Sequence, residues 1–271
     1  MLPIGKSTPA DTDNDDTLLN KWYPYPRYLL RKYLINKYLA SQKLSGKNCL
    51  EIGYGAGDML LLFASYALTV TGYDFSDMAY KEAMRRINKR IDFADRINLI
   101  KIKEELQNRK YDYIFAFEVL EHIEDDVMAI REWTDMLKTD GQLIISVPAH
   151  KKKWGNIDRA TGHYRRYERL ELKELVCKAN LKLSNIWCYG YPMTILLDPI
   201  LNATYSPKNN SDICSLDREY LTKQSGTKRY KSGLAKYVSN VWSLYPFCLL
   251  QQLFLSKELG SAYIVIARNV K

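Results

Sequence analysis

Cysteine and histidine are both scarce in this chain, whose 271 residues include five cysteines and three histidines. The cysteines lie far apart, form no C-x-x-C pair and are odd in number. This argues against a disulfide framework and against a thiolate metal site. We therefore expect a reducing, cytoplasmic environment.

Long apolar runs are also lacking. A membrane-spanning helix needs roughly 18 apolar residues, and the run that comes nearest, Val241–Leu255, is interrupted by Pro246, Gln251 and Gln252. The first residues do not combine a basic stretch with an apolar one, as a secretion signal does. We expect membrane contact to be peripheral at most.

Acidic residues are fewer than basic ones, 31 against 40, and the formal net charge is +9. Such a charge attracts anionic partners, including nucleic acid. Lys151–Lys153 followed by Trp154 fit a patch for phosphates and stacked bases. We interpret most of this positive charge as a solvated surface of lysine and arginine. Because no RNA-binding module is appended, nucleic acid is the less favoured partner. The oligomeric state is left open.

Short apolar runs alternate with amphipathic stretches from residue 48 onward, which is typical of βα units around a parallel sheet. The predicted strands are Asn48–Ile52, Thr69–Tyr73, Asn98–Ile102, Tyr111–Phe117, Gln142–Val147, Leu183–Cys188 and Ala262–Arg268. The predicted helices are Trp22–Leu39, Asp58–Tyr66, Asp77–Ile91, Asp125–Leu137 and Leu170–Ala179. An α/β fold follows from this alternation.

The domain organisation is predicted as one core with an insertion. We expect an amino-terminal tail and amphipathic helix at 1–45, a Rossmann-like core at 46–190, a helical substrate cap at 191–257, and a last strand at 258–271 that returns to the core. The cap segment is too long for a plain loop, and loops of that length usually serve function.

A glycine-rich turn follows the first predicted strand and opens a helix. Gly53 and Gly55 permit a tight turn and a close approach of a ligand, and Gly57 lets the helix pack closely on the strand. Glu51, just ahead, suits a cationic ligand. Asp74 ends the second strand, where a carboxylate can accept both hydroxyls of a ribose, and Phe75 beside it can pack on an adenine face.

These motifs, together with Phe115–His122, resemble those of class I S-adenosylmethionine-dependent methyltransferases. The resemblance implies S-adenosylmethionine as cofactor and a Rossmann-like seven-stranded, mostly parallel sheet with one antiparallel strand and helices on both faces. It implies that the three glycines line the methionine part and that Asp74 holds the ribose. It also places Glu118 near the cofactor and Glu104 near the adenine amine, although Lys103-Glu104 replaces the usual Gly-Asp pair.

A second resemblance concerns the run after the fifth strand. Val147–His150 and Gly162–Tyr167 are similar to the branch of these methyltransferases that tailors glycans and other small molecules. Here His163 is the favoured general base and His150 the alternative, because an imidazole titrates near neutral pH. Tyr164 and Tyr167 flank the base. Arg165 and Arg166 either bind an anionic group of the substrate or belong to a solvated turn.

Glu118, Glu121 and His122 form an E-x-x-E-H sequence, which with His163 can hold a divalent cation. Similar sequences occur in metal-dependent methyltransferases acting on RNA 3′ ends and on catechol-like quinone precursors. The same letters also occur in metal-free members. We expect no metal here.

The predicted activity is therefore methyl transfer from S-adenosylmethionine to an oxygen or nitrogen of a small-molecule, sugar or glycan-precursor acceptor. One alternative is a metal-using methyltransferase that acts on RNA or on a catechol-like oxygen. Another is a catalytically silent subunit that only binds the cofactor.

Overall fold

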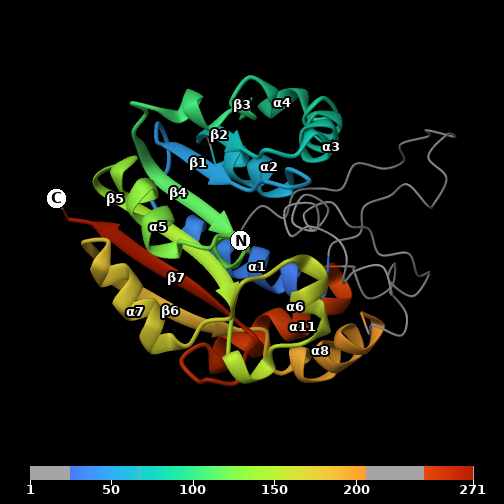
Figure 1. The fold of residues 1–271 in the computed structure, drawn as a ribbon. Coiled ribbons are helices and arrows are strands. Elements are labelled where there is room, and N and C mark those ends of the chain that lie inside the picture. Colours follow the sequence, from blue (N-terminus) through green and yellow to red (C-terminus); the bar gives the residue numbers. More distant parts are fainter. Residues whose placement is uncertain (1–24, 67, 206–240, 271) are drawn as a thin grey trace, which may run out of the picture.

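A single twisted sheet of seven strands organises the molecule (Figure 1). The computed structural model describes residues 25–66, 68–205 and 241–270. The strands are β1 Asn48–Ile52, β2 Thr69–Tyr73, β3 Ile97–Ile100, β4 Tyr111–Phe117, β5 Leu137–Pro148, β6 Leu181–Tyr189 and β7 Ala262–Asn269. Their order across the sheet is β3-β2-β1-β4-β5-β7-β6.

Strands β1 to β5 pair in parallel, and β7 runs antiparallel between β5 and β6. Ala262 at the start of β7 lies opposite both Pro148 of β5 and Tyr189 of β6. The predicted seven-stranded, mostly parallel Rossmann-like sheet with one antiparallel strand is confirmed. The switch in strand order lies at β1 and β4, where sheets of this kind bind ligands beyond the carboxyl ends of their strands.

Helices cover both faces of the sheet, as predicted. One face packs against α1 Pro26–Ala40, α2 Asp58–Ser65, α3 Asp77–Ile87, α4 Ile91–Ala94 and α11 Val241–Leu250. The other packs against α5 Asp126–Asp135 and α7 Arg169–Lys178. At the carboxyl edge lie α6 Asn156–Thr161 and α8 Met193–Thr204. The described residues also form short 3-10 helices there, η2 Lys103–Leu106, η3 Leu120–His122, η4 Lys151–Lys153 and η7 Gln251–Phe254.

Several element boundaries differ from those predicted. The helix expected over Asp77–Ile91 is split, because α3 ends at Ile87 and α4 begins at Ile91. The strand expected from Gln142 begins at Leu137, and the helix before it ends at Asp135. The helix expected from Trp22 begins at Pro26, and Trp22 itself lies outside the described residues. Proline suits this first position, where the missing N–H would have no partner in the helix.

The two ends of the predicted cap are helical. Within 191–257 the structure describes α8 and α11, and 206–240 lie outside the described residues. Helix α11 belongs to the core, since Leu244 and Cys248 are buried beside α1. The side chain of Gln251 accepts from the N–H of Gly190 and donates to the carbonyl of Leu30. The domain boundaries themselves stay a prediction.

None of the described helices combines the length and apolar character that crossing a membrane requires.

Candidate active site

The glycine loop has the backbone conformation that its sequence predicts. Gly53, Gly55 and Gly57 have φ values of 70°, 52° and 76°, in the left-handed region that favours glycine. A Cβ on Gly53 would lie 2.5 Å from a methyl carbon of Val119, and one on Gly57 would lie 2.8 Å from Cβ of Ala83. The loop therefore tolerates no side chain at these two positions.

Asp74 fastens the glycine loop to the next turn. Its Oδ2 accepts from the N–H of Gly55 at 3.0 Å, and its Oδ1 accepts from the N–H of Ser76 at 2.9 Å. Burial raises the pKa of Asp74, and these two hydrogen bonds partly offset the effect. Each carboxylate oxygen of Asp74 therefore already accepts one backbone hydrogen bond. The binding of ribose by Asp74 stays a prediction.

A cavity of about 610 Å³ lies between this loop, α1, the end of β4, α6 and α8. The glycine loop contributes Gly53 and Gly55, and Glu51 lines the cavity beside them. Among the described residues, Oε2 of Glu51 has no hydrogen-bond partner, and burial raises the pKa of this carboxyl group well above its ordinary value. A cationic ligand in the cavity would stabilise the ionised form of Glu51.

His163 lines the same cavity and is held by a buried carboxylate. Its Nδ1 lies 2.9 Å from Oδ1 of Asp158, which is fully buried, and Nε of Arg166 donates to both oxygens of Asp158 at 2.8 and 2.9 Å. Burial alone would raise the pKa of Asp158, but the bonds from His163 and Arg166 outweigh it and lower the pKa to about 2. Asp158 is therefore ionised at neutral pH and can only accept, so Nδ1 of His163 carries the proton and Nε2 is left as the basic nitrogen.

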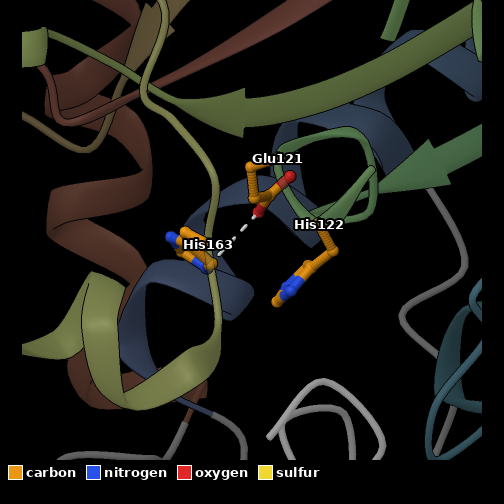
Figure 2. Close-up of side chains that lie close together, drawn as sticks. All are labelled: Glu121, His122 and His163. Carbon is orange, nitrogen blue, oxygen red and sulfur yellow. Dashed lines mark ion pairs between the residues drawn. The ribbon is translucent and has the colours of Figure 1, made fainter. Parts of the chain in front are cut away.

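Glu121 and His122, both on η3, lie next to His163 (Figure 2). Oε1 of Glu121 is 3.8 Å from Nε2 of His163, and the rings of His122 and His163 meet edge to face with centroids 4.7 Å apart. Burial, reinforced by Glu118, raises the pKa of Glu121 well above its ordinary value. Burial and then His163 lower the pKa of His122 to about 3, so His122 is a neutral imidazole.

Glu118 faces helix α1 rather than the Glu121 group. Its Oε2 accepts from Arg27 at 3.0 Å, and its Oε1 accepts from Ser146 at 2.9 Å and lies 3.4 Å from Arg31. Burial would raise the pKa of Glu118, but Arg27 and Arg31 lower it below the ordinary value. The backbone φ of Glu118 is 56°, a left-handed conformation that non-glycine residues seldom adopt. The α1 arginines therefore hold Glu118 as an ionised carboxylate on the cavity wall.

The family model for the methyltransferase domain matches residues 23–185, more than half of the chain. The chain belongs to the class I S-adenosylmethionine-dependent methyltransferases. The ubiquinone biosynthesis O-methyltransferase of Nitrosospira multiformis is 30% identical over 108 residues, which are 38% of this chain and 44% of that protein. That of Nitrosomonas europaea is 29% identical over 107 residues, with the same two shares. The chain thus spans less than half of the length of either relative.

Phosphoethanolamine N-methyltransferase 2 of Haemonchus contortus, solved in complex with S-adenosylmethionine, resembles this methyltransferase in fold. The TM-score is 0.54 at 17% sequence identity, and the match covers 89% of this chain and 53% of that one. At this identity the likeness concerns the fold alone.

The methyltransferase fold brings some of the predicted cofactor residues to the cavity and leaves others away from it. Glu51, Gly53, Gly55 and Glu118 line the cavity. Asp74, Phe75, Glu104 and Gly57 do not, and Phe75 and Glu104 are exposed to solvent. The left-handed loop fits the positively charged methionine end of S-adenosylmethionine, and so does the Glu51 oxygen that has no partner among the described residues. The ribose and adenine assignments stay predictions.

Only some of the predicted catalytic and substrate-binding residues line the cavity. His163 and Arg166 line the cavity, whereas His150, Tyr164, Arg165 and Tyr167 do not. Arg165 binds Asp126 and the carbonyl of Glu124, and the hydroxyl of Tyr167 donates to Asp126. Arg166 lines the cavity with a guanidinium that Asp158 and the carbonyl of Ala149 already engage. In the structure, then, these two arginines bind carboxylates and carbonyls of the protein itself.

Sequence reasoning missed Asp158, the residue that orients His163. A carboxylate five positions before a candidate base, at the first turn of a short helix, was the available signal. Reasoning also missed Thr194 at the start of α8, which lines the cavity. Its hydroxyl is buried and has no hydrogen-bond partner in the described part of the chain. No local pattern identified Thr194, because its position depends on how α8 packs over the sheet.

Proposed function

We propose that this methyltransferase transfers the methyl group of S-adenosylmethionine to an oxygen of a hydroxylated small molecule, a sugar or a glycan precursor bound in the cavity. One observation carries the proposal: His163, with Nδ1 held by Asp158, lines the cavity that the glycine loop also lines. An imidazole in this setting removes the acceptor's proton as the methyl group moves. The O-methyltransferase names of the two relatives support oxygen rather than nitrogen as the acceptor atom.

The positions of the residues that line the cavity assign a role to each in the proposed reaction. Glu51 and the glycine loop bind the charged end of the cofactor, and His163 lies across the cavity as the base. Because the leaving group of a sulfonium is neutral, the protein has little charge to stabilise on it and acts chiefly by positioning and deprotonating the acceptor. Thr194 and the apolar residues of α8 contribute the wall that contacts the acceptor.

The first test is binding and turnover. Calorimetry with S-adenosylmethionine distinguishes a methyltransferase from a silent subunit, which would bind the cofactor without transferring methyl to any acceptor. For turnover the probes are catechol, 3,4-dihydroxybenzoate and a monosaccharide panel, with methylated products detected by mass spectrometry. We expect cofactor binding and an O-methylated product. Absence of cofactor binding would contradict the proposal.

A second candidate mechanism uses a divalent cation at Glu121, His122 and His163. Their ligand atoms all lie within 4.8 Å of one another. Both oxygens of Glu121 are buried and make no hydrogen bond with the described residues, and Asp158 supports His163 as carboxylates support metal-binding histidines. A bound Mg²⁺, Mn²⁺ or Zn²⁺ would supply Lewis acidity that lowers the pKa of an acceptor hydroxyl.

Chelation separates the two candidates. If His163 acts as a base without metal, as we propose, removing metal with EDTA leaves turnover unchanged. If the cation is required, EDTA abolishes turnover and Mg²⁺, Mn²⁺ or Zn²⁺ restores it. The matched variant is Glu121→Gln, which keeps the shape of the side chain. Under the first mechanism it retains turnover in EDTA-treated protein, and under the second it loses the response to added metal.

A further inference from the structure

A second group of metal-binding side chains lies apart from the cavity. His150 follows the end of β5, Cys188 belongs to β6, and Glu258 precedes the start of β7. Their ligand atoms lie within 4.8 Å of one another, and none of the three residues lines the cavity. His150 and Cys188 are 5% and 1% exposed, whereas Glu258 lies at the surface. The group therefore has a buried half and a half open to solvent.

The spacing of these atoms fits a tetrahedral ion. Nε2 of His150 lies 3.8 Å from Sγ of Cys188. A sulfur and a nitrogen bound to one tetrahedral Zn²⁺ at ordinary bond lengths are roughly 3.6 Å apart. Small movements of the two side chains would therefore bring both within bonding distance of one ion.

Neighbouring groups orient the three side chains. Oε2 of Glu168 lies 3.6 Å from Nδ1 of His150 and so favours presentation of Nε2 toward Cys188. Arg169 and the hydroxyl of Tyr263 donate to the two oxygens of Glu258. Each oxygen retains a further lone pair for a ligand bond. Such outer partners of histidine and carboxylate ligands are the usual companions of metal sites.

We propose that His150, Cys188 and Glu258 form a zinc-binding site with water in the fourth position. The sequence argued against a thiolate metal site, because no local cysteine pattern reveals ligands that come from three distant segments. A set of one thiolate, one imidazole and one carboxylate favours Zn²⁺ over Mg²⁺ or Ca²⁺, which prefer oxygen ligands. On binding, the thiol of Cys188 releases its proton to solvent and its sulfur bonds to the ion. This site is independent of the proposed methyl transfer.

The ion would crosslink the segment that leads into β7 to the ends of β5 and β6. β7 is inserted between β5 and β6, and the three ligands come from the ends of β5 and β6 and from the segment that leads into β7. Lys153, which lines the cavity, donates to the carbonyl of Gly260 in that same segment at 2.9 Å. The zinc ligands therefore lie beside a segment that one hydrogen bond joins to the cavity wall, and methyl transfer does not require the ion.

Cobalt is the spectroscopic probe, because Co²⁺ replaces Zn²⁺ and a thiolate ligand gives it an intense near-ultraviolet absorption. Metal-free full-length protein is titrated with Co²⁺. We expect this absorption to saturate at one equivalent and to disappear when Zn²⁺ is added. Glu121, His122 and His163 include no sulfur, so binding there cannot produce it. No thiolate absorption in the folded wild-type protein would overturn the proposal.

Variants assign the absorption to its residues. We expect Cys188→Ser to abolish it, and Cys177→Ser, Cys214→Ser and His163→Ala to retain it. Undiminished absorption in Cys188→Ser would overturn the proposal. Since Cys188 is buried and its replacement can disturb folding, Glu258→Gln at the surface is the second variant. It should keep the absorption while weakening Co²⁺ binding by at least the roughly tenfold that the loss of an outer partner of a ligand costs. Unchanged affinity in this variant would contradict the role of Glu258.

Discussion

His163 and His150 both follow the fifth strand, and their surroundings give them different chemistry. His163 has a buried, ionised carboxylate on Nδ1 and a cavity beside it. His150 has a φ of 62°, its ring contacts Cys188 and Tyr263, and it does not line the cavity. The sequence could not separate the two, because the direction of a side chain after a strand depends on backbone angles that no local pattern specified.

We predict that His163→Ala lowers turnover by roughly 10²- to 10⁴-fold, the range for losing a general base. Affinity for S-adenosylmethionine should remain nearly unchanged, because the residue lies beyond the glycine loop. The measurement is single-turnover methyl transfer between about pH 6 and 9.

The control for that experiment is His150→Ala, which should keep the wild-type pH profile of transfer. If His150→Ala abolishes transfer and His163→Ala does not, the base is His150. If both variants keep wild-type rates and pH dependence, the enzyme works by positioning alone.

Asp158 should contribute stability that depends on pH. Its pKa falls from 3.8 to about 2 in the folded protein, a difference worth about 2 kcal/mol. Because the folded pKa is the lower one, this stabilisation is present above about pH 4 and is lost as the pH falls through about 2. Denaturant unfolding should show that the free energy of unfolding decreases less between pH 5 and pH 2 in Asp158→Asn than in the wild-type protein.

The matched control is the exposed Asp140→Asn, which should follow the wild-type curve. Equal losses in wild type and Asp158→Asn would show that the pKa of Asp158 is not lowered by folding.

Among the elements, three short strands were predicted most accurately. β1, β2 and β4 have the predicted bounds, because each is a short segment rich in apolar, aromatic or β-branched residues. β5 was predicted from Gln142 but starts at Leu137, since Lys138, Thr139 and Asp140 are exposed polar residues that carry no strand signal. The position of α8 over the cavity was not predictable, because it depends on contacts with a helix almost 50 residues away in the chain.

Asn202 on α8 provides that contact, because its side chain caps the start of α6. Its Oδ1 accepts from the N–H groups of Asn156 and Ile157 at 2.5 and 3.4 Å, at the start of the helix that carries Asp158. We predict that Asn202→Ala lowers the free energy of unfolding by about 1 kcal/mol, the usual cost of losing an N-cap. Turnover should fall as well, because Asp158 is then held less firmly against His163.

Thermal unfolding and turnover of Asn202→Ala are compared with Asn88→Ala, an exposed residue at the end of α3. If the two variants match in both measurements, Asn202 does not support the site.

At the scale of the whole molecule, the cavity is assembled from segments far apart in the sequence. The glycine loop, α1, η3, α6 and α8 each contribute to its wall. The cofactor motif was predictable because its glycines and acidic residue are contiguous. The pairing of Glu118 with Arg27 and Arg31 was not, because it joins α1 to the end of β4 across about 90 residues.

We propose that one cavity holds the cofactor's methyl group between the glycine loop and His163. The most direct test is a crystal structure with S-adenosylhomocysteine, the product that remains after transfer. We predict that the amino acid part of this ligand contacts Gly53 and Gly55, with its sulfur directed into the cavity toward His163. A ligand bound with its sulfur facing away from His163, or outside this cavity, would contradict it.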